Sequence, residues 1–283
     1  MSVLDGRAMA AQIREDLKGE VSALRARGVV PALAVVMLGD DPAARAYVRG
    51  IERASAAVDV ACTVRRLPAD AAHEDLARTL DELSADPAVH GIILQTPLPP
   101  QIDALRLGAH IAVRKDVDGI NPTSAGHLLL GLPSYPPATA AAVMEILRRA
   151  AIPLRGRQAV VIGRSAIVGK PVALLLLRED ATVTVCHSRT ADLPAVARGA
   201  DVLVVAIGRA RHVGAGFVKP GATVIDVGIN EVDGGIVGDV DYDAVAPIAG
   251  AITPVPGGVG PLTNVMLLRN TVAAAREAAS LTS

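Results

Sequence analysis

The chain has 283 residues, of which 51% are hydrophobic and 20% are charged, and its formal net charge is −1. This length predicts about two domains. The near-neutral charge gives no electrostatic reason to expect a nucleic acid or an anionic membrane as partner. No apolar run approaches the ~18 residues that cross a bilayer, and the charged first residues do not form a secretory signal. A cytoplasmic protein is expected.

Side chains that often mark a metal or nucleic-acid site are sparse. Aromatic residues make up 1% of the chain, whereas a surface that stacks single-stranded bases needs several of them. The six histidines include no pair at metal-binding helical spacing, so no metal site is expected. The two cysteines, Cys62 and Cys186, are far apart in the chain and are predicted to be buried thiols rather than a bridge.

The first half of the chain alternates helices and strands. Residues 4–27 have apolar positions at helical spacing, and Gly28 ends the predicted helix. Residues 31–39 form an apolar run that predicts a buried strand, and the helix that follows carries Tyr47. A further strand at residues 91–95 runs into a proline-rich segment, where pairing cannot continue. This alternation predicts an α/β layer.

The second half begins with a strand that runs directly into a glycine-flanked turn. Residues 158–163 form the strand, and a helix is predicted over residues 172–178. Such a turn points free backbone N–H groups and the positive end of the helix at a phosphate. Five residues separate Gly163 from Gly169, and Pro171 occupies the position of the Ser or Thr of a phosphate-loop ATPase. The segment therefore favours a dinucleotide over a nucleoside triphosphate.

The next strand, residues 181–189, indicates which dinucleotide binds. An acidic residue at the end of this strand holds the adenosine ribose in NAD-binding sheets, whereas an arginine accommodates the extra phosphate of NADP. Here the strand ends in His187, Ser188 and Arg189, with no acid before Asp192. This ending favours NADP, although the same residues are also compatible with an ordinary polar loop.

Two more apolar runs, residues 201–208 and 222–228, continue the pattern, and each ends in glycine. Repeated apolar strands separated by helix-length segments predict a parallel sheet that is covered on both faces. Residues 136–259 are therefore predicted to form a Rossmann-type domain. The final helix, predicted over residues 262–279, could pack back on the first domain.

Four long motifs follow one another along the chain: VIGRSAIVGKP at 161–171, ATVTVCHS at 181–188, KPGATVIDVGIN at 219–230 and ITPVPGGVGP at 252–261. With these motifs, in this order, the chain resembles the bifunctional methylenetetrahydrofolate dehydrogenase/cyclohydrolase family over nearly its whole length. The resemblance implies an α/β fold with two domains, usually in a homodimer, and a folate cleft between the domains. Residues 1–135 and the C-terminal helix, 260–283, would form the catalytic domain, and residues 136–259 would bind NADP.

The resemblance also assigns site residues. Tyr47 matches the tyrosine that stacks on the folate, Gln95 matches a catalytic glutamine, and Asp118 matches the aspartate that hydrogen-bonds the pterin ring. Alternatively, Gln95 is a strand-end residue that satisfies a loop, and Tyr47 is an ordinary aromatic on a helix face. The other substrate-binding matches are Leu94, Thr96, Pro256, Gly257, Gly258, Val259 and Gly260, and the cofactor-binding matches are Gly163, Arg164, Ser165, Ser188 and Ile229.

The chain departs from the family pattern at the chemistry. The family places a lysine one helical turn after the tyrosine, and this position is Ile51 here. A lysine whose pKa is lowered by burial can move protons, whereas an isoleucine can only pack; such a loss typically costs about a hundred- to ten-thousandfold in rate. Other departures accompany it: Ala44 replaces a serine, Ile120 and Asn121 replace Phe-His, and residues 137–142 lack the family's Pro-Cys-Thr-Pro-x-Gly pattern.

The two reactions of the family depend on lysine unequally. Hydride transfer from methylene-tetrahydrofolate to NADP mainly needs the donor carbon to be positioned, whereas hydrolysis of the methenyl product needs an activated water. We therefore expect dehydrogenase activity in one-carbon metabolism with weak or absent cyclohydrolase activity. Two alternatives are a specialised enzyme that passes the one-carbon unit to another acceptor, and a non-catalytic folate-binding paralogue.

Overall fold

The computed structural model describes residues 1–96, 98–99 and 101–281, and it divides into two compact units. One unit comprises residues 1–11 and 139–263, and the other comprises residues 12–138 and 264–283. Each unit is thus built from more than one stretch of the chain. Pro97 and Pro100 of the proline-rich segment, and residues 282–283 of the segment 260–283 assigned to the catalytic domain, lie outside the described residues.

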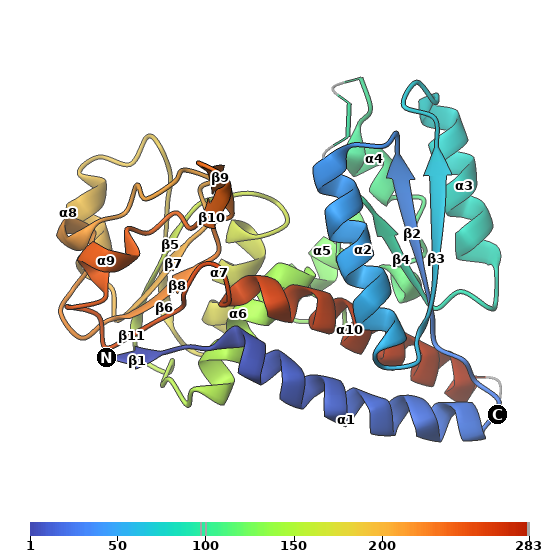
Figure 1. Cartoon of the computed structure of the whole chain (residues 1–283), viewed down its shortest axis with the longest axis horizontal. Coiled ribbons are helices and arrows are strands. Elements are labelled where there is room, and N and C mark those ends of the chain that lie inside the picture. The colour runs from blue at the N-terminus through green and yellow to red at the C-terminus, as the bar shows by residue number, and fades with distance from the viewer. Residues whose placement is uncertain (97, 100, 282–283) are drawn as a thin grey trace. The chain divides into compact units, whose positions relative to one another are not determined.

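The unit of residues 12–138 and 264–283, here called the Tyr47 unit, is built on a three-stranded sheet in the order β3-β2-β4. Its strands are β2 (Ala32–Leu38), β3 (Ala61–Leu67) and β4 (Gly91–Leu94), and both pairings are parallel. The connecting helices α2 (Pro42–Ala56) and α3 (His73–Ala85) lie on opposite faces of the sheet (Figure 1). The strands predicted from the apolar runs, and the helix that carries Tyr47, are confirmed.

Strand β3 was not predicted from the sequence. It lies at the edge of the sheet, and its residues alternate between exposed and half-buried positions. Because it contains Thr and Arg residues, β3 lacks the continuous apolar run of a central strand, which is covered on both faces. Central β2, by contrast, is buried from Leu33 to Met37.

Helices complete the Tyr47 unit. Helix α1 (Gly6–Ala26) buries Ile13, Leu17, Val21 and Leu24, as the helical spacing predicted. Helix α3 contributes Leu76 and Leu80 to a core that also contains residues of β2 and β4. The remaining elements are α4 (Ala104–Gly108), η1 (Val113–Lys115), α5 (Pro122–Leu130) and α10 (Val259–Leu281), whose residues from 264 onward belong to this unit.

The unit of residues 1–11 and 139–263, here called the Rossmann unit, contains a six-stranded sheet in the order β1-β11-β8-β7-β5-β6. Every pairing in it is parallel, as predicted, and the two strands expected to be neighbours pair from Gln158 to Ile162. Its strands are β1 (Ser2–Val3), β5 (Gln158–Ile162), β6 (Thr182–Cys186), β7 (Val202–Val205), β8 (Thr223–Asp226) and β11 (Ala251–Ile252).

The order of the strands places a switch point beside β5. The chain runs from β5 to β6 on one side and then returns to β7 and β8 on the other side. Ligands of such sheets bind outside the carboxyl ends of the strands at this point. The other elements are α6 (Ala138–Arg149), α7 (Gly169–Arg178), α8 (Leu193–Ala197), η2 (Ala215–Phe217), β9 (Asn230–Val232), β10 (Gly235–Val237) and α9 (Tyr242–Val245).

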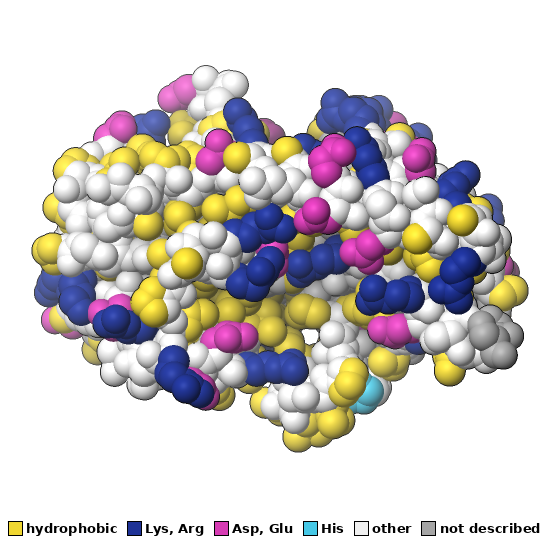
Figure 2. Space-filling view, turned by 90° about the horizontal axis from the view of Figure 1, so that it is seen from below, with side chains coloured by type: hydrophobic (Ala, Val, Ile, Leu, Met, Phe, Trp, Pro, Cys, Tyr) yellow, Lys and Arg dark blue, Asp and Glu magenta, His cyan; other side chains and the backbone are white. Residues whose placement is uncertain are grey.

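The surface carries charges of both signs. On the face drawn in Figure 2, basic side chains are interspersed with acidic ones rather than gathered into one basic patch. Among the described residues, no helix combines the length and the apolar character needed to cross a bilayer.

The core of the Tyr47 unit predicts the effect of truncating Leu80. This side chain is fully buried, so Leu80→Ala leaves a cavity and should lower the free energy of unfolding by about 2–5 kcal/mol. Leu105, which is 63% exposed on α4, provides the matched control, and Leu105→Ala should change stability by less than about 0.5 kcal/mol. Urea unfolding of both variants measures the difference, and equal effects would contradict the assigned core.

Candidate functional site

The predicted cofactor loop starts where β5 ends. Gly163 has a φ of 129°, and a Cβ at this position would clash with the carbonyl oxygen of Ala206. Only glycine therefore fits, because the loop after β5 passes directly against the loop after β7. Arg164 and Ser165 follow as exposed residues before α7 begins at Gly169.

Ser165 changes one expectation about this loop. Its Oγ accepts hydrogen bonds from the backbone N–H groups of Val168 at 3.1 Å and Gly169 at 3.3 Å. The prediction that the turn leaves its N–H groups free is therefore wrong for these two, since a serine side chain already caps the entry to α7. The hydroxyl instead ties the loop to the start of the helix.

The second predicted cofactor segment lies next to the first. Gly163 donates its N–H to the carbonyl of Cys186 at 2.9 Å, so the loops that follow β5 and β6 begin side by side. The turn that carries exposed Ser188 is held by its own side chains: the His187 N–H donates to Thr190 Oγ1, and the Arg189 N–H donates to His187 Nδ1. The structure thus brings Gly163, Arg164, Ser165 and Ser188 to one edge of the sheet.

A cavity of about 140 Å³ joins another predicted cofactor residue to the predicted folate wall. It is lined by Ile229, which is 64% exposed, and by the glycine-rich segment that includes Pro256, Gly257, Gly258, Val259 and Gly260. Arg7 of α1 also lines it, and its Nε lies 3.5 Å from the position of a Cβ at Gly257. No sequence pattern indicated Arg7, because a single arginine on an amphipathic helix has no distinguishing feature.

In the Tyr47 unit, the structure brings Tyr47 and Asp118 close together. Burial raises the pKa of the Tyr47 hydroxyl, and the nearby Asp118 charge raises it further, so the phenol stays protonated. Burial also raises the pKa of Asp118 to about 6; the Ala138 N–H, donated to it at 2.9 Å, opposes this rise, and Asp116 adds to it. Asp118 is therefore a carboxyl that can exchange a proton near neutral pH.

The loop that presents Asp118 is held by a second carboxylate that the sequence analysis did not assign. Asp116 is fully buried and accepts the N–H groups of Ile120 at 3.0 Å and Asn121 at 2.9 Å. Asn121 in turn caps α5 and donates its Nδ2 to the carbonyl of Ile111 at 2.8 Å. The Asn121 side chain thus has a structural role in the loop, whereas Ile120 contributes its backbone N–H.

The strand-end residues have simpler surroundings. Leu94 is buried, and Thr96 is exposed. The Gln95 backbone N–H continues the ladder to Val36, and its side chain donates Nε2 to the carbonyl of Thr96 at 2.6 Å. The alternative interpretation, a glutamine that satisfies its own loop, predicts this contact, so a catalytic role for Gln95 stays a prediction.

Ile51 lies one helical turn after Tyr47 on α2 and is completely buried. The preceding residue, Gly50, faces α10: a Cβ there would lie 3.2 Å from Nδ2 of Asn264. The Oδ1 of Asn264 is buried without a hydrogen-bond partner among the described residues. This amide, which the sequence analysis missed because it is distant in the chain, can hold a proton donor but cannot titrate as a lysine does.

The other two departures fall at helix starts. The Ala44 N–H donates to the capping side chain of Asp41 at 2.8 Å in the first turn of α2. The alanines at 138 and 140–142 are buried in the first turns of α6, where small side chains allow close packing.

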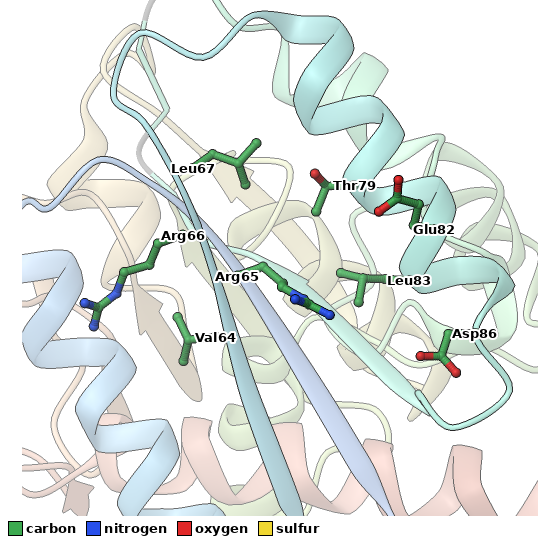
Figure 3. Close-up of a pocket in the computed structure, with 8 residues that line it drawn as sticks. All are labelled: Val64, Arg65, Arg66, Leu67, Thr79, Glu82, Leu83 and Asp86. Carbon is green, nitrogen blue, oxygen red and sulfur yellow. The ribbon is translucent and has the colours of Figure 1, made fainter.

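A larger surface pocket, of about 490 Å³, lies between β3 and α3 and contains none of the predicted site residues (Figure 3). Figure 3 shows Arg65 on the side of β3 that faces α3, whereas Arg66 points to the other side. Glu82 and Asp86 line the same pocket, so its charges are mixed. The predicted chemistry therefore does not lie there.

Two family models match this chain. The family model described as the catalytic domain of tetrahydrofolate dehydrogenase/cyclohydrolase matches residues 4–118, and the model of its NAD(P)-binding domain matches residues 137–279. The chain belongs to the tetrahydrofolate dehydrogenase/cyclohydrolase family. The predicted family and the predicted α/β fold with two domains and a parallel sheet are confirmed.

Individual relatives of this family align over nearly their whole length. The bifunctional protein FolD of Parafrankia is 62% identical over 97% of this chain and 99% of its own. The crystal structure of FolD from Campylobacter jejuni has a TM-score of 0.96 at 42% identity and covers 98% of this chain and 99% of its own. FolD from Trypanosoma brucei, complexed with NADP cofactor and inhibitor, has a TM-score of 0.94 at 40% identity, covering 100% and 99%.

The raised pKa of Asp118 predicts how the stability of the folded protein depends on pH. Its folded-state pKa of about 6 exceeds the ordinary value of 3.8, so the folded protein binds this proton more tightly than the unfolded chain does. Its contribution to stability is therefore full below about pH 4 and is lost as the pH rises through 6. Asp118→Asn should flatten this part of the Tm profile.

Exposed Asp70 in the same unit provides the control, and Asp70→Asn should leave the profile of the unmodified chain unchanged. Asp226, another carboxyl with a raised pKa, is present in both variants and cancels in the comparison, whereas the difference between the profiles reports Asp118 together with its interaction with Asp116. Thermal unfolding between pH 4 and 7 is the measurement, and parallel profiles for the two variants would contradict the assignment.

Proposed function

We propose that this protein oxidises 5,10-methylene-tetrahydrofolate to methenyl-tetrahydrofolate with NADP, and that its cyclohydrolase activity is weak or absent. The observation that carries the second half is Ile51. It occupies the family's lysine position on α2, one turn after Tyr47, and its side chain is fully buried and apolar. The proposal thus separates two reactions that its bifunctional relatives combine.

The cofactor half of the site supports the redox reaction. The loops after β5 and β6 carry the residues that match the family's NADP positions, and the strand end with Ser188 and Arg189 has no acid to favour NAD. When bound, NADP supplies the hydride acceptor. The chain's own task is to hold the donor carbon against it, for which Tyr47 and Asp118 would bind the folate ring. The glycine-rich segment of residues 256–260 matches the family's folate-binding positions.

Hydrolysis of the methenyl product needs a proton acceptor, and the predicted site residues do not supply a free one. Water must lose a proton as it attacks, and the group that takes this proton needs a pKa near the working pH. Ile51 has no proton chemistry, and the amides of Gln95 and Asn264 orient donors without titrating. Asp118 has a suitable pKa, but it is held by the Ala138 N–H and would be engaged by the pterin ring.

The location, assembly and domain boundaries complete the proposal. The composition of the chain supports a cytoplasmic location, and the family resemblance supports a homodimer. It also supports a catalytic domain of residues 1–135 and 260–283, and an NADP-binding domain of residues 136–259. Light scattering at micromolar concentration tests the dimer, since a single monomer mass would contradict it.

The central test mixes purified protein with methylene-tetrahydrofolate and NADP, and follows NADPH and the methenyl chromophore as separate signals. Methenyl should appear with NADPH and then decay only at the rate measured without enzyme. Formation of formyl-tetrahydrofolate at an enzyme-dependent rate, abolished in Gln95→Ala, would contradict the proposal. Tight folate binding without either signal would favour another one-carbon acceptor or a binding role.

Restoring the lysine tests the role of position 51. Ile51→Lys should raise the cyclohydrolase rate by about a hundred- to ten-thousandfold, the typical contribution of a positioned acid-base group. Ile51→Met keeps an apolar side chain of similar volume and should leave the rate unchanged. A folded Ile51→Lys variant without the gain would show that the pocket differs from its relatives beyond this one residue.

A further inference from the structure

The buried carboxylate of Asp239 lies beneath two loops at the carboxyl edge of the Rossmann sheet. Asp239 follows β10, and its side chain is completely inaccessible to solvent. It accepts three consecutive backbone N–H groups of the loop after β7: Ile207 at 2.6 Å, Gly208 at 3.0 Å and Arg209 at 2.7 Å. Three successive donors converging on one carboxylate fix the shape of that loop.

The same carboxylate joins this loop to the next one along the sheet. Asn230, which begins β9 after β8 has ended, donates its Nδ2 to Asp239 at 3.0 Å. A neighbouring buried carboxylate, Asp226, accepts the backbone N–H groups of Gly228 at 2.9 Å and of Asp239 itself at 3.0 Å. The two acids therefore fix the loops after β7 and β8 relative to one another.

The backbone makes room for these side chains at a specific position. A Cβ at Gly228 would clash with the carboxylate of Asp239, so any other residue there would displace one of the two. The loop after β7 is also in contact with the predicted cofactor loop, because Ala206 packs its carbonyl against Gly163. The carboxylate thus supports a surface that continues directly into the dinucleotide site.

The strand order indicates which part of the dinucleotide this surface would contact. Strand β6, whose end carries Ser188, lies on one side of β5, and β7 and β8 lie on the other. In a doubly wound sheet, the residue that holds the adenosine ribose lies at the end of the strand that follows the phosphate-binding turn and its helix. Strand β6 has this position here. The loops after β7 and β8 would therefore flank the nicotinamide half. Exposed Ile229 lies in the second of these loops, between Gly228 and Asn230.

We propose that Asp239 is a positioning residue for the nicotinamide half of NADP, a role that rests on the proposed NADP-dependent function. The carboxylate does not touch the cofactor; it acts through the backbone of Ile207, Gly208 and Arg209 and through the side chain of Asn230. Without it, buried donors lose their acceptor and the loops adopt other conformations. The loops after β5 and β6 would hold the adenosine half, and its binding would not depend on Asp239.

Calorimetric titration of Asp239→Asn with two ligands tests the proposal. The carboxamide keeps the shape of the side chain but has one acceptor oxygen and directs N–H donors at other N–H groups. Affinity for NADP should fall by about ten- to a hundredfold. Affinity for adenosine 2′,5′-bisphosphate, which carries only the adenosine half, should stay within about twofold of the unmodified protein, a change below ~0.4 kcal/mol.

Asp233→Asn provides the matched control. Asp233 lies exposed in the turn between β9 and β10 with a φ of 48°, a conformation that asparagine also adopts, and the charge change is the same. Both affinities should remain unchanged in this variant. Should Asp239→Asn fail to fold, Asn230→Ala removes one donor of the four, and a smaller loss confined to NADP is expected.

Two results would overturn the inference: an equal loss of both ligands in a folded variant, which indicates a merely structural role, or unchanged NADP binding. Failure of the proposed function is distinguishable from either, because the unmodified protein would then bind neither NADP nor the bisphosphate. Thermal unfolding of each variant establishes that the comparison is made on folded protein.

Discussion

Parallel strand pairing is the constraint on which this structure depends. Parallel strands all end at the same edge of a sheet, so the loops that follow β5, β6, β7 and β8 emerge next to one another. Beyond the last ladder pair, their backbone N–H groups need other acceptors. Side chains supply many of them: Ser165 for the first loop, Thr190 for the second, Asp239 for the third and Asp226 for the fourth.

In the Tyr47 unit, side-chain carboxylates likewise accept the backbone N–H groups of a loop. Asp116 and Asp118 are neighbouring carboxylates that accept backbone N–H groups, and burial raises the pKa of both. Removing a charge from water is costly unless hydrogen bonds compensate it, so the N–H groups that order the loop also offset part of the cost of burying these two side chains. A loop built this way can present a carboxyl whose proton is exchangeable at physiological pH.

Ile51 is a buried side chain without any polar group. A lysine there would have to be desolvated, which is what lowers its pKa and makes it useful in proton transfer. An isoleucine packs in the same place without that cost, and it contributes apolar burial instead of proton chemistry. Position 51 of the described chain therefore adds to the apolar core of the Tyr47 unit.

The sequence by itself determined the features that depend on neighbouring residues. The apolar runs of β2, β4, β5, β6, β7 and β8, the helical spacing of α1 and the glycine-flanked turn at Gly163 each have a local pattern, and together they predicted a parallel α/β fold. Strands β1 and β11 have only two residues each, too few for any periodicity, and edge strand β3 is too polar to stand out.

Only the tertiary structure decided the groups that act across distance. Ile207 and Asp239 are 32 residues apart, and no local pattern indicates that the backbone of one meets the carboxylate of the other. The same holds for Arg7 beside Gly257 and for Asn264 beside Gly50. Local propensities set helices and strands, whereas such polar contacts form only after the sheet brings loops together and excludes the water that would otherwise satisfy them.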